Sequence, residues 1–329
     1  MPKPNPWRPV SVHPEQAALI PEVSGNAING LGEAERRPAR MVYWAPNPDD
    51  IPHGRMQRWF YGVDPENPHL KRAREDRARI LAEPMPEPEG APAERAPEDW
   101  TRALDAFVAE GQCEKIGVAE MDPAWVLEGH AIPFSRVIVL AVAHDYAEIA
   151  TAPEPRAGAE VVRQYGRAGA AARRIAGWLR RQGWPAEPVT GPMTGALLLI
   201  PPALACGFGE LGKHGSIINP EFGASFRLSA VLTDAPFAPT PPREHGIDAF
   251  CESCRVCEDA CPPLAIASER QVVRGERKWY VDFDACLPFF NQTHGCGICI
   301  AVCPWSRPGV GLSLAGKLAR RAERLASED

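Results

Sequence analysis

The sequence has no long hydrophobic run and no surplus of positive charge. No window approaches the roughly eighteen apolar residues of a membrane-spanning helix, so we expect no membrane segment. The N-terminus (MPKPNPWRPVSVHPEQ) has neither an apolar stretch nor a twin arginine. It is therefore not an export signal, and we expect a cytoplasmic protein. With a formal net charge of -6, the chain gives no reason to expect a nucleic-acid partner.

A phosphate-binding loop is also missing. The spacing G-x-G-x-x-G occurs at Gly207, Gly209 and Gly212, but it follows a proline pair and has no clear strand–loop–helix context. We therefore expect no dinucleotide site there. The glycines still allow backbone to approach a large ligand closely, so this glycine loop is predicted either to cradle a cofactor or to form a tight structural turn.

Cysteine, in contrast, is plentiful and regularly spaced. Eight of the ten cysteines fall between residues 251 and 304, in the order C-x2-C-x2-C-x3-C-P, a lone cysteine, and then C-x2-C-x3-C-P. The first run has the spacing of bacterial two-cluster ferredoxins, in which the fourth cysteine reaches across to the other cluster. We predict two [4Fe-4S] clusters, one held by Cys251, Cys254, Cys257 and Cys303 and the other by Cys261, Cys286, Cys296 and Cys299.

Two further points concern these cysteines. Nine residues separate Cys286 from Cys296, which departs from the simple ferredoxin pattern, and structural zinc is the alternative because it also uses C-x2-C pairs. So many thiols committed to metal indicate a reducing compartment rather than a disulfide framework. The remaining two, Cys113 and Cys206, are expected to be small buried apolar residues.

At 329 residues, the chain is far longer than a small ferredoxin, so a large domain is expected before the cysteine module. The first residues are rich in X-Pro turns and are predicted to wrap a core rather than form one. The predicted division is a proline-rich wrapping segment and linker at 1–98, a core domain at 99–245, a two-cluster module at 246–308 and a C-terminal helix at 309–329.

Hydrophobic periodicity predicts the main elements. Residues 136–143 (RVIVLAVA) form a continuous aliphatic run that is typical of a strand covered on both faces, and His144, Asp145 and Tyr146 emerge where it stops. Residues 157–182 have the three-to-four spacing of a long amphipathic helix. Shorter helices are predicted at 67–81, from a cap at Asp99 or Thr101 to 108, and at 312–325, where a packing helix is expected. Further strands are predicted at 116–119 and 228–233.

The order of these motifs resembles a known family. The run from Gly207 to Arg227 (GFGELGKHGSIINPEFGASFR), then VLTDAPFAP, HGIDAFCESCRVCEDACPPLAI, KWYVDFDAC and CGICIAVCPW, closely resembles the catalytic core of cobalamin-dependent reductive dehalogenases. Upstream, IVLAVAHDYAEIATAP matches the family's strand-plus-tyrosine segment. The resemblance covers roughly residues 100 to 308. More distantly, the chain resembles epoxyqueuosine reductase.

The resemblance implies an α+β fold, with a nitroreductase-like core that holds cobalamin base-off and a C-terminal, bacterial-ferredoxin-like module with two [4Fe-4S] clusters. The sequence has no D-x-H-x-x-G motif to replace the lower cobalt ligand, which agrees with that implication. The family's tyrosine proton donor matches Tyr146, with Tyr165 as the second candidate. The accompanying basic residue matches Lys213 in the glycine loop, and an ammonium there would stabilise the phenolate.

The implied function is reductive removal of halide from an organohalide. Electrons would come from a separate ferredoxin or flavodoxin, because only about twenty residues follow the last cysteine motif. Two alternatives remain open. One is reduction of an epoxide or another activated C–O bond, as in epoxyqueuosine reductase. The other is a non-catalytic electron carrier or corrinoid-handling protein.

Overall fold

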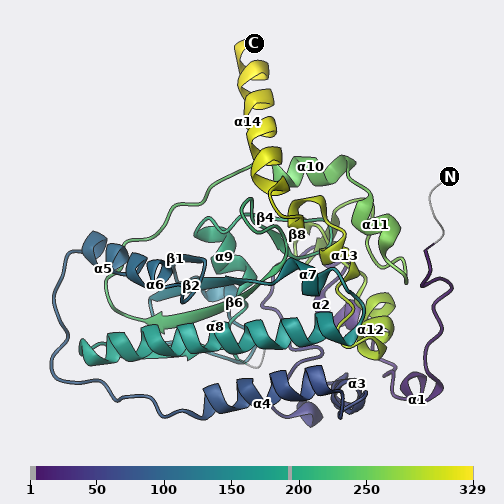
Figure 1. Ribbon diagram of the computed structural model, residues 1–329, viewed down its shortest axis with the longest axis horizontal. Helices are drawn as coiled ribbons and strands as arrows, with labels where there is room; N and C mark the ends of the chain where they lie inside the picture. Colours follow the sequence, from purple (N-terminus) through teal and green to yellow (C-terminus); the bar gives the residue numbers. More distant parts are fainter. Residues whose placement is uncertain (1–4, 192–194, 329) are drawn as a thin grey trace.

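The core of the molecule is a four-stranded antiparallel sheet (Figure 1). The computed structural model describes residues 5–191 and 195–328. The strands run in the order β1-β2-β6-β3, with bounds β1 Lys115–Glu120, β2 Arg136–Ala143, β6 Phe226–Thr233 and β3 Ala186–Val189. The predicted strand at 136–143 is confirmed, and those at 116–119 and 228–233 are confirmed with slightly wider bounds. The short strand β3 was not predicted.

Strand β2 is buried on both faces because it lies between two hydrophobic layers. Ile138, Leu140 and Val142 face one layer, whereas Val137 and Val139 face the other. Successive side chains of a strand point to opposite faces, so a strand inside two layers must be apolar throughout. This explains why the run RVIVLAVA does not alternate between apolar and polar residues.

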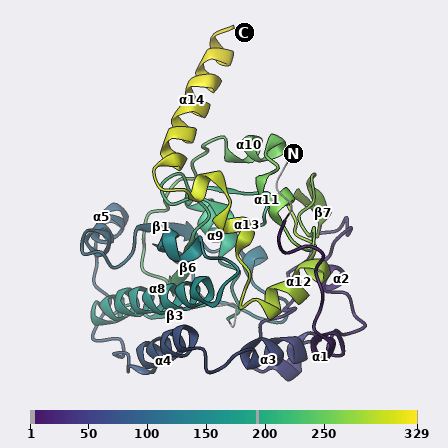
Figure 2. The same cartoon turned by 45° about the vertical axis from the view of Figure 1, so that its right-hand side comes forward.

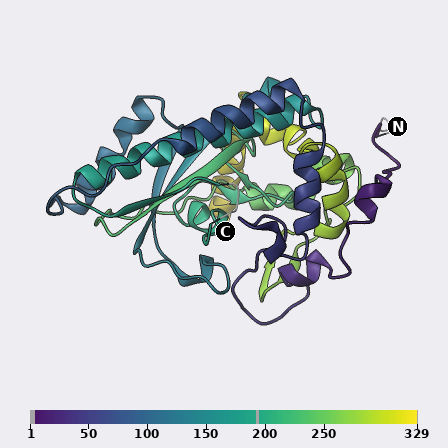
Figure 3. The ribbon, with the colours of Figure 1, turned by 90° about the horizontal axis from the view of Figure 1, so that it is seen from below.

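Helix α8 (Pro155–Arg181) covers one face of the sheet. It packs Ala168, Ala172, Ile175 and Leu179 against the strands, which confirms the predicted long amphipathic helix. Helix α4 (Pro68–Ala82) lies along α8 on its outer side, and Figure 3 shows the two helices side by side (blue and teal). Asn67 caps α4 through its side-chain oxygen, as expected for a helix that begins Asn-Pro.

The opposite face of the sheet is covered by the segment around the glycine loop. Helix α9 (Ile200–Ala205) is followed by the hairpin of β4 (Glu210–Leu211) and β5 (Ile217–Ile218). Cys206 and Phe208 are fully buried in this second layer, and Cys113 is buried in the first. Both cysteines outside the cluster sets are therefore small buried residues, as predicted.

The C-terminal module lies at one end of the sheet (Figure 2). Its elements are short, because the chain must turn repeatedly around the cysteine sets. They are α10 Ile247–Ser253, α11 Val256–Ala260, β7 Gln271–Val273, β8 Glu276–Lys278, α12 Phe283–Gln292, α13 Ile298–Ala301 and the 3-10 turn η3 Pro304–Ser306.

The N-terminal residues pack on this module. Their elements are α1 Pro14–Ala17, α2 Gly25–Asn29, η1 Pro48–Asp50 and α3 Gly54–Gly62. The ring of Tyr43 contacts the rings of Phe283 and Phe290 on α12, and its hydroxyl donates to the buried side chain of Asn291. Asn26 donates to Asp282 at 2.8 Å. Residues far apart in sequence thus form one layer.

Two elements differ from the predicted bounds. The helix predicted from Asp99 or Thr101 to 108 is two helices, α5 Pro97–Ala103 and α6 Asp105–Ala109, because Pro97 supplies the first helical position and the chain breaks at Leu104. The Pro/Glu-rich residues 83–98, from which the sequence predicts a solvated linker, contact the body of the protein, since Arg180 of α8 donates to the Pro86 carbonyl at 2.9 Å. Two short elements precede the site, η2 Pro123–Trp125 and α7 Tyr146–Ile149.

The terminal helix α14 (Val310–Glu328) projects from the body (Figure 1). Leu314, Ala315 and Leu318 pack against the cysteine module, but Leu312 is 61% and Leu325 is 55% exposed. The prediction of a packing helix is therefore wrong for most of its length, because no other described element lies beside the outer turns. Among the described residues, no helix combines the length and the apolar character needed to cross a membrane.

Candidate active site and cluster module

Six of the eight patterned cysteines lie in or against two clusters of buried residues: Cys251 and Cys303 in one, and Cys257, Cys261, Cys286 and Cys299 in the other. Burial, followed by the charges of Cys303, Cys251 and Cys254, raises the pKa of Cys257 to about 12. Burial and then the charges of Cys296 and Cys261 raise the pKa of Cys286 to about 12. None of the ten cysteines, all of which lie in the described part of the chain, forms a disulfide. In these two cases the acting cysteines belong to the same predicted group, the first group being Cys251, Cys254, Cys257 and Cys303. Cys257 also acts on Cys299 of the second group, so the assignment of ligands to each cluster stays a prediction.

The backbone around these cysteines points amide groups at sulfur. The Ala265 N–H donates to the sulfur of Cys261 at 3.4 Å. Burial raises the pKa of Cys303, and the N–H groups of Trp305 and Ser306 partly offset this rise. The Lys213 N–H acts on Cys251 in the same way. Amide donors stabilise thiolate sulfur, so the donor set and its surroundings fit an iron–sulfur cluster.

Lys213, the predicted partner of the proton donor, lies beside the first cysteine group. It is 2% exposed, and its ammonium contacts the Glu252 carbonyl of α10 and the Glu258 carboxylate of α11, each at 3.5 Å. Tyr146 is half-buried at the start of α7, and its hydroxyl donates to the Ala301 carbonyl at 3.2 Å. The contacts of the described residues give Tyr146 and Lys213 no common partner, so their pairing stays a prediction.

The second tyrosine candidate has a different neighbourhood. The guanidinium of Arg227, on β6, lies over the ring of Tyr165, on α8, at 5.1 Å from the ring centroid. His144 follows strand β2 and lies close enough to Arg227 to feel its charge: burial, and secondarily Arg227, lowers the pKa of His144 well below its usual value. A phenol, a guanidinium and a neutral imidazole thus come together from three elements.

Other side chains complete this site. Gly191 lies against the Tyr165 ring, where an added Cβ would come within 3.2 Å, and its carbonyl accepts from Arg77 of α4 at 2.6 Å. Tyr61 of α3 lies near Arg77 and Tyr165, which both act on its pKa, although burial is the main cause of its raised value. The N-terminal segment therefore contributes a wall to the site.

Several buried polar atoms here have no hydrogen-bond partner among the described residues. They are the Nε of Arg227, the Nε2 of His144, the Nε of Arg77 and the Oε1 of Gln164. A buried polar atom without a partner costs about 1–3 kcal/mol, so folded proteins rarely leave several of them together. Their concentration around Tyr165 indicates that a polar molecule completes the site.

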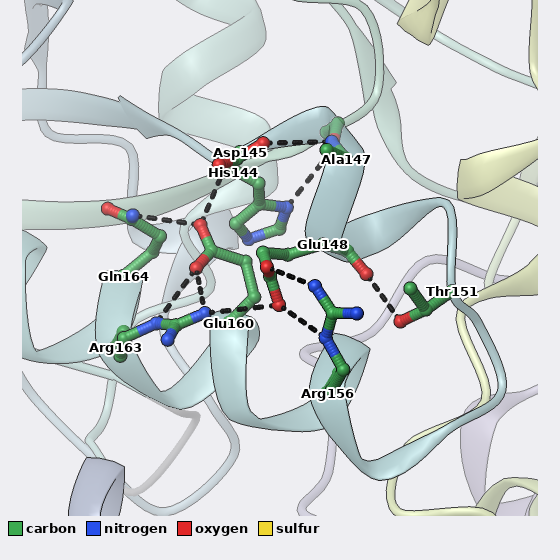
Figure 4. A network of polar contacts seen from close by, with 10 residues as sticks. His144, Asp145, Ala147, Glu148, Thr151, Arg156, Glu160, Arg163 and Gln164 are labelled. Carbon is green, nitrogen blue, oxygen red and sulfur yellow. Dashed lines mark hydrogen bonds and ion pairs between the residues drawn. The ribbon is translucent and has the colours of Figure 1, made fainter. Parts of the chain in front are cut away.

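A buried carboxylate fixes this region (Figure 4). Glu160 of α8 is nearly fully buried; it accepts from the Asp145 backbone N–H at 2.8 Å and from Gln164 at 2.9 Å, and it pairs with Arg163 at 2.8 Å. These bonds tie the end of β2 to α8. His144 is held in turn by Ser225, whose hydroxyl lies 3.2 Å from its Nδ1. The end of the sheet is thus a rigid frame for Tyr165 and Arg227.

The predicted cofactor-binding glycines pack against the chain itself. A Cβ on Gly209, at φ +134°, would lie 2.0 Å from the Ile218 carbonyl oxygen, and one on Gly207 would lie 2.8 Å from the Pro241 oxygen. One on Gly212 would meet the Ile218 side chain at 2.5 Å. These approaches favour the tight structural turn over the ligand cradle, and the cofactor role of these glycines stays a prediction.

Sequence reasoning missed Arg227 and gave His144 only an ordinary polar role. One signal for Arg227 was present: it is a charged residue inside the apolar run FRLSAVLT, which forms the central strand β6. A charge in such a strand is rarely buried without a partner or a function. Its neighbour Tyr165 could not be found this way, because a tyrosine on an amphipathic helix is ordinary.

Comparison with known proteins finds similarity to the cysteine module and to a longer stretch of the chain. The 4Fe-4S dicluster domain model matches residues 250–306, a range that contains all eight patterned cysteines. A tetrachloroethene reductive dehalogenase of Desulfitobacterium hafniense is 35% identical over 217 residues, covering 62% of this chain and 39% of that protein. An epoxyqueuosine reductase of Alicycliphilus denitrificans is 31% identical over 109 residues, covering 31% of this chain and 29% of that protein. The chain thus spans about two fifths of the length of the dehalogenase that it matches.

Solved structures agree on the fold. A catabolic reductive dehalogenase in complex with 3-bromo-4-hydroxybenzoic acid superposes with a TM-score of 0.72 at 20% sequence identity, over 90% of this chain and 46% of that chain. A second structure, described as suggesting a mechanism for B12-dependent dehalogenation, gives a TM-score of 0.70 over 92% of this chain and 48% of that one. The predicted α+β fold with a C-terminal iron–sulfur module is confirmed.

Proposed function

We propose that this chain, which is related in sequence and fold to the reductive dehalogenases, replaces a halogen of an organohalide by hydrogen. The reaction takes up two electrons and one proton, and it releases halide and the C–H product. The observation that carries the proposal is the site around Tyr165 and Arg227, in which an acid, a cation and unpartnered polar atoms lie together inside a dehalogenase fold.

The proposed cofactors are two [4Fe-4S] clusters and a corrinoid bound base-off. Cys251, Cys254, Cys257 and Cys303 would hold one cluster, and Cys261, Cys286, Cys296 and Cys299 the other. A corrinoid, when bound, supplies a low-valent cobalt that breaks the carbon–halogen bond. The unpartnered polar atoms of Arg77, His144 and Arg227 fit the amide groups at the edge of such a ring, or a polar substrate.

For the proton, we propose Tyr165 as the donor, with Arg227 stabilising the phenolate that remains. His144, kept neutral by burial, adds no competing positive charge. The donor predicted from the family resemblance, Tyr146 with Lys213, is the alternative. It is less favoured because the hydroxyl of Tyr146 already donates to a main-chain carbonyl.

The two tyrosines make a matched pair of variants. We expect Tyr165→Phe to lower the dehalogenation rate on the order of 100-fold or more, because general acid catalysis contributes about 10²–10⁴. Tyr146→Phe should keep the rate within a few fold. The measurement is halide release by cofactor-reconstituted protein under anaerobic conditions with a chemical reductant, with iron and corrinoid content checked for each variant.

The opposite ranking would assign the role to Tyr146. Equal activity of both variants and the unmodified chain would remove phenol catalysis from the mechanism. Turnover of epoxyqueuosine in tRNA instead of organohalides would favour the other enzyme class to which the chain is related. No turnover of either substrate by fully loaded protein would leave the electron-carrier function.

The electron donor and the cellular location are part of the same proposal. We propose a separate ferredoxin or flavodoxin as donor, and a cytoplasmic protein without a nucleic-acid partner. The part of the chain that such a donor would reduce is the cysteine module, which matches a 4Fe-4S dicluster domain. Reduction of the clusters by a purified low-potential ferredoxin, and recovery of activity in the cytosolic fraction of cells, are the corresponding measurements.

A further inference from the structure

Lys213 is among the largest fully buried side chains of the protein, together with Trp100, Trp305 and Phe208. Lysine is rarely buried to this extent, since moving an ammonium out of water costs several kcal/mol unless other charges compensate. Its surroundings are the Glu252 carbonyl and the Glu258 carboxylate, each 3.5 Å from Nζ, and the Trp279 ring, whose centroid is 5.2 Å away.

These contacts do not satisfy the ammonium. It has three N–H donors, and 3.5 Å is the outer limit for a hydrogen bond. The Glu258 Oε2 atom that faces it is buried and has no hydrogen-bond partner among the described residues. The other oxygen of this carboxylate pairs with Arg255, a surface cation that is 64% exposed. Glu258 is therefore shared between two cations, and Lys213 lacks a full counter-charge.

The missing negative charge lies in the first cysteine group. Glu252 is the residue after Cys251, and Glu258 is the residue after Cys257. The Lys213 N–H is a donor to the Cys251 sulfur, and Trp279 packs in one cluster of buried residues with Cys251 and Cys303. The ammonium thus lies against the residues that follow Cys251 and Cys257, and against a ring that packs with Cys251 and Cys303.

We propose that Lys213 is the buried counter-charge of the cluster held by Cys251, Cys254, Cys257 and Cys303 and that it raises the reduction potential of this cluster. Reduction adds one negative charge, and a fixed cation in a low-dielectric interior favours the more negative state. Glu258 opposes this effect. The inference rests on the cluster part of the proposed function and is independent of the corrinoid and the substrate.

The test is an anaerobic redox titration followed by electron paramagnetic resonance, which needs neither corrinoid nor organohalide. We expect Lys213→Gln to shift the potential of this cluster to a more negative value and Glu258→Gln to shift it to a more positive one. Lys213→Arg should stay near the unmodified protein. Arg255→Gln is the matched control: it removes a cation from the same carboxylate, but in water, where screening makes the shift small.

The expected result is that Lys213→Gln and Glu258→Gln shift the reduction potential in opposite directions, and that only one cluster signal moves. Cys254→Ser identifies that signal, because it alters a proposed ligand of this cluster alone. Unchanged potentials, shifts of the same sign, or a shift of the other cluster would overturn the proposal. If Lys213→Gln does not retain iron, the Glu258→Gln and Lys213→Arg titrations still decide it. Absence of dehalogenation by the loaded protein would refute the proposed function but not this inference.

Discussion

At the scale of single residues, the molecule buries three histidines, His53, His144 and His214, and burial lowers the pKa of each. Burial lowers the pKa of His214 to about 4, and burial together with Arg227 lowers the pKa of His144 well below its usual value. A histidine that stays neutral in the folded state while the unfolded chain binds a proton makes stability depend on pH. The native state is favoured above the ordinary histidine pKa and loses stability as the pH falls below it.

The first prediction concerns His214. Between its unfolded pKa of about 6.5 and its folded pKa of about 4, the unfolded state binds the additional proton, so the free energy of unfolding falls as the pH is lowered. At pH 5 the loss from this residue alone is about 2 kcal/mol. The measurement is the anaerobic thermal midpoint of cluster-loaded protein at pH 7 and pH 5.

His214→Gln supplies the comparison for that measurement. Its midpoint should be lower than that of the unmodified protein at pH 7, because the imidazole Nδ1 accepts from the Ser216 N–H at 3.2 Å. It should, however, change less between the two pH values. A variant with the same pH dependence as the unmodified chain would show that another group controls the acid transition.

At the scale of elements, the hairpin of β4 and β5 depends on glycine. Gly209 has φ +134°, and a methyl group there would overlap the Ile218 carbonyl oxygen of the partner strand. The hairpin covers the second face of the sheet and leads directly to Lys213. The turn therefore links the packing of the core to the position of the buried ammonium.

We predict that Gly209→Ala destabilises the protein by on the order of 3 kcal/mol or more, because backbone must move to remove the overlap. Gly90→Ala is the control: Gly90 also has positive φ, but an added Cβ meets no atom within 4 Å. The two thermal midpoints, measured on cluster-loaded protein, should differ clearly. Similar midpoints would mean that the hairpin adapts and that its glycine is dispensable.

At the scale of the whole molecule, the N-terminal segment and the cysteine module stabilise each other. Arg8 donates to the carbonyl of Cys261, a proposed cluster ligand, at 2.5 Å and to the carbonyl of Asp259 at 3.1 Å. Gln16 donates to the Pro288 carbonyl of α12 at 3.0 Å, and the hydroxyl of Tyr43 donates to Asn291. Helix α12 also carries Cys286, so cluster binding and the N-terminal wrap share one element.

Removal of iron should therefore loosen the N-terminal wrap. We predict that chelator-treated protein is cleaved by trypsin at Arg55 and Arg58 of α3 at least ~10-fold faster than loaded protein, since α3 packs on α12. Cleavage at Arg320 and Arg321 of the projecting helix α14 is the internal control, because these residues are exposed in either state. Equal acceleration at both places would indicate global unfolding instead, and no acceleration would separate the wrap from the clusters.

The sequence by itself determined the features that depend on local pattern. An aliphatic run identified β2, a period of three to four identified α8, and fixed cysteine spacings identified the 4Fe-4S dicluster module, because each signal lies within a few turns of chain. It did not reveal the two-residue strands β4 and β5, or how far α14 projects. Such short or partly unpacked elements depend on what lies beside them rather than on their own periodicity.

Only the tertiary structure decided which polar residues meet. Arg227 reaches Tyr165 from another element, and Lys213 contacts Glu252, the residue that follows the first patterned cysteine. The N-terminal wrap likewise meets α12 across most of the sequence. Contacts of this kind arise when separate elements pack on one core, and no spacing within a single element encodes them. The chemistry proposed for this protein lies in these long-range contacts.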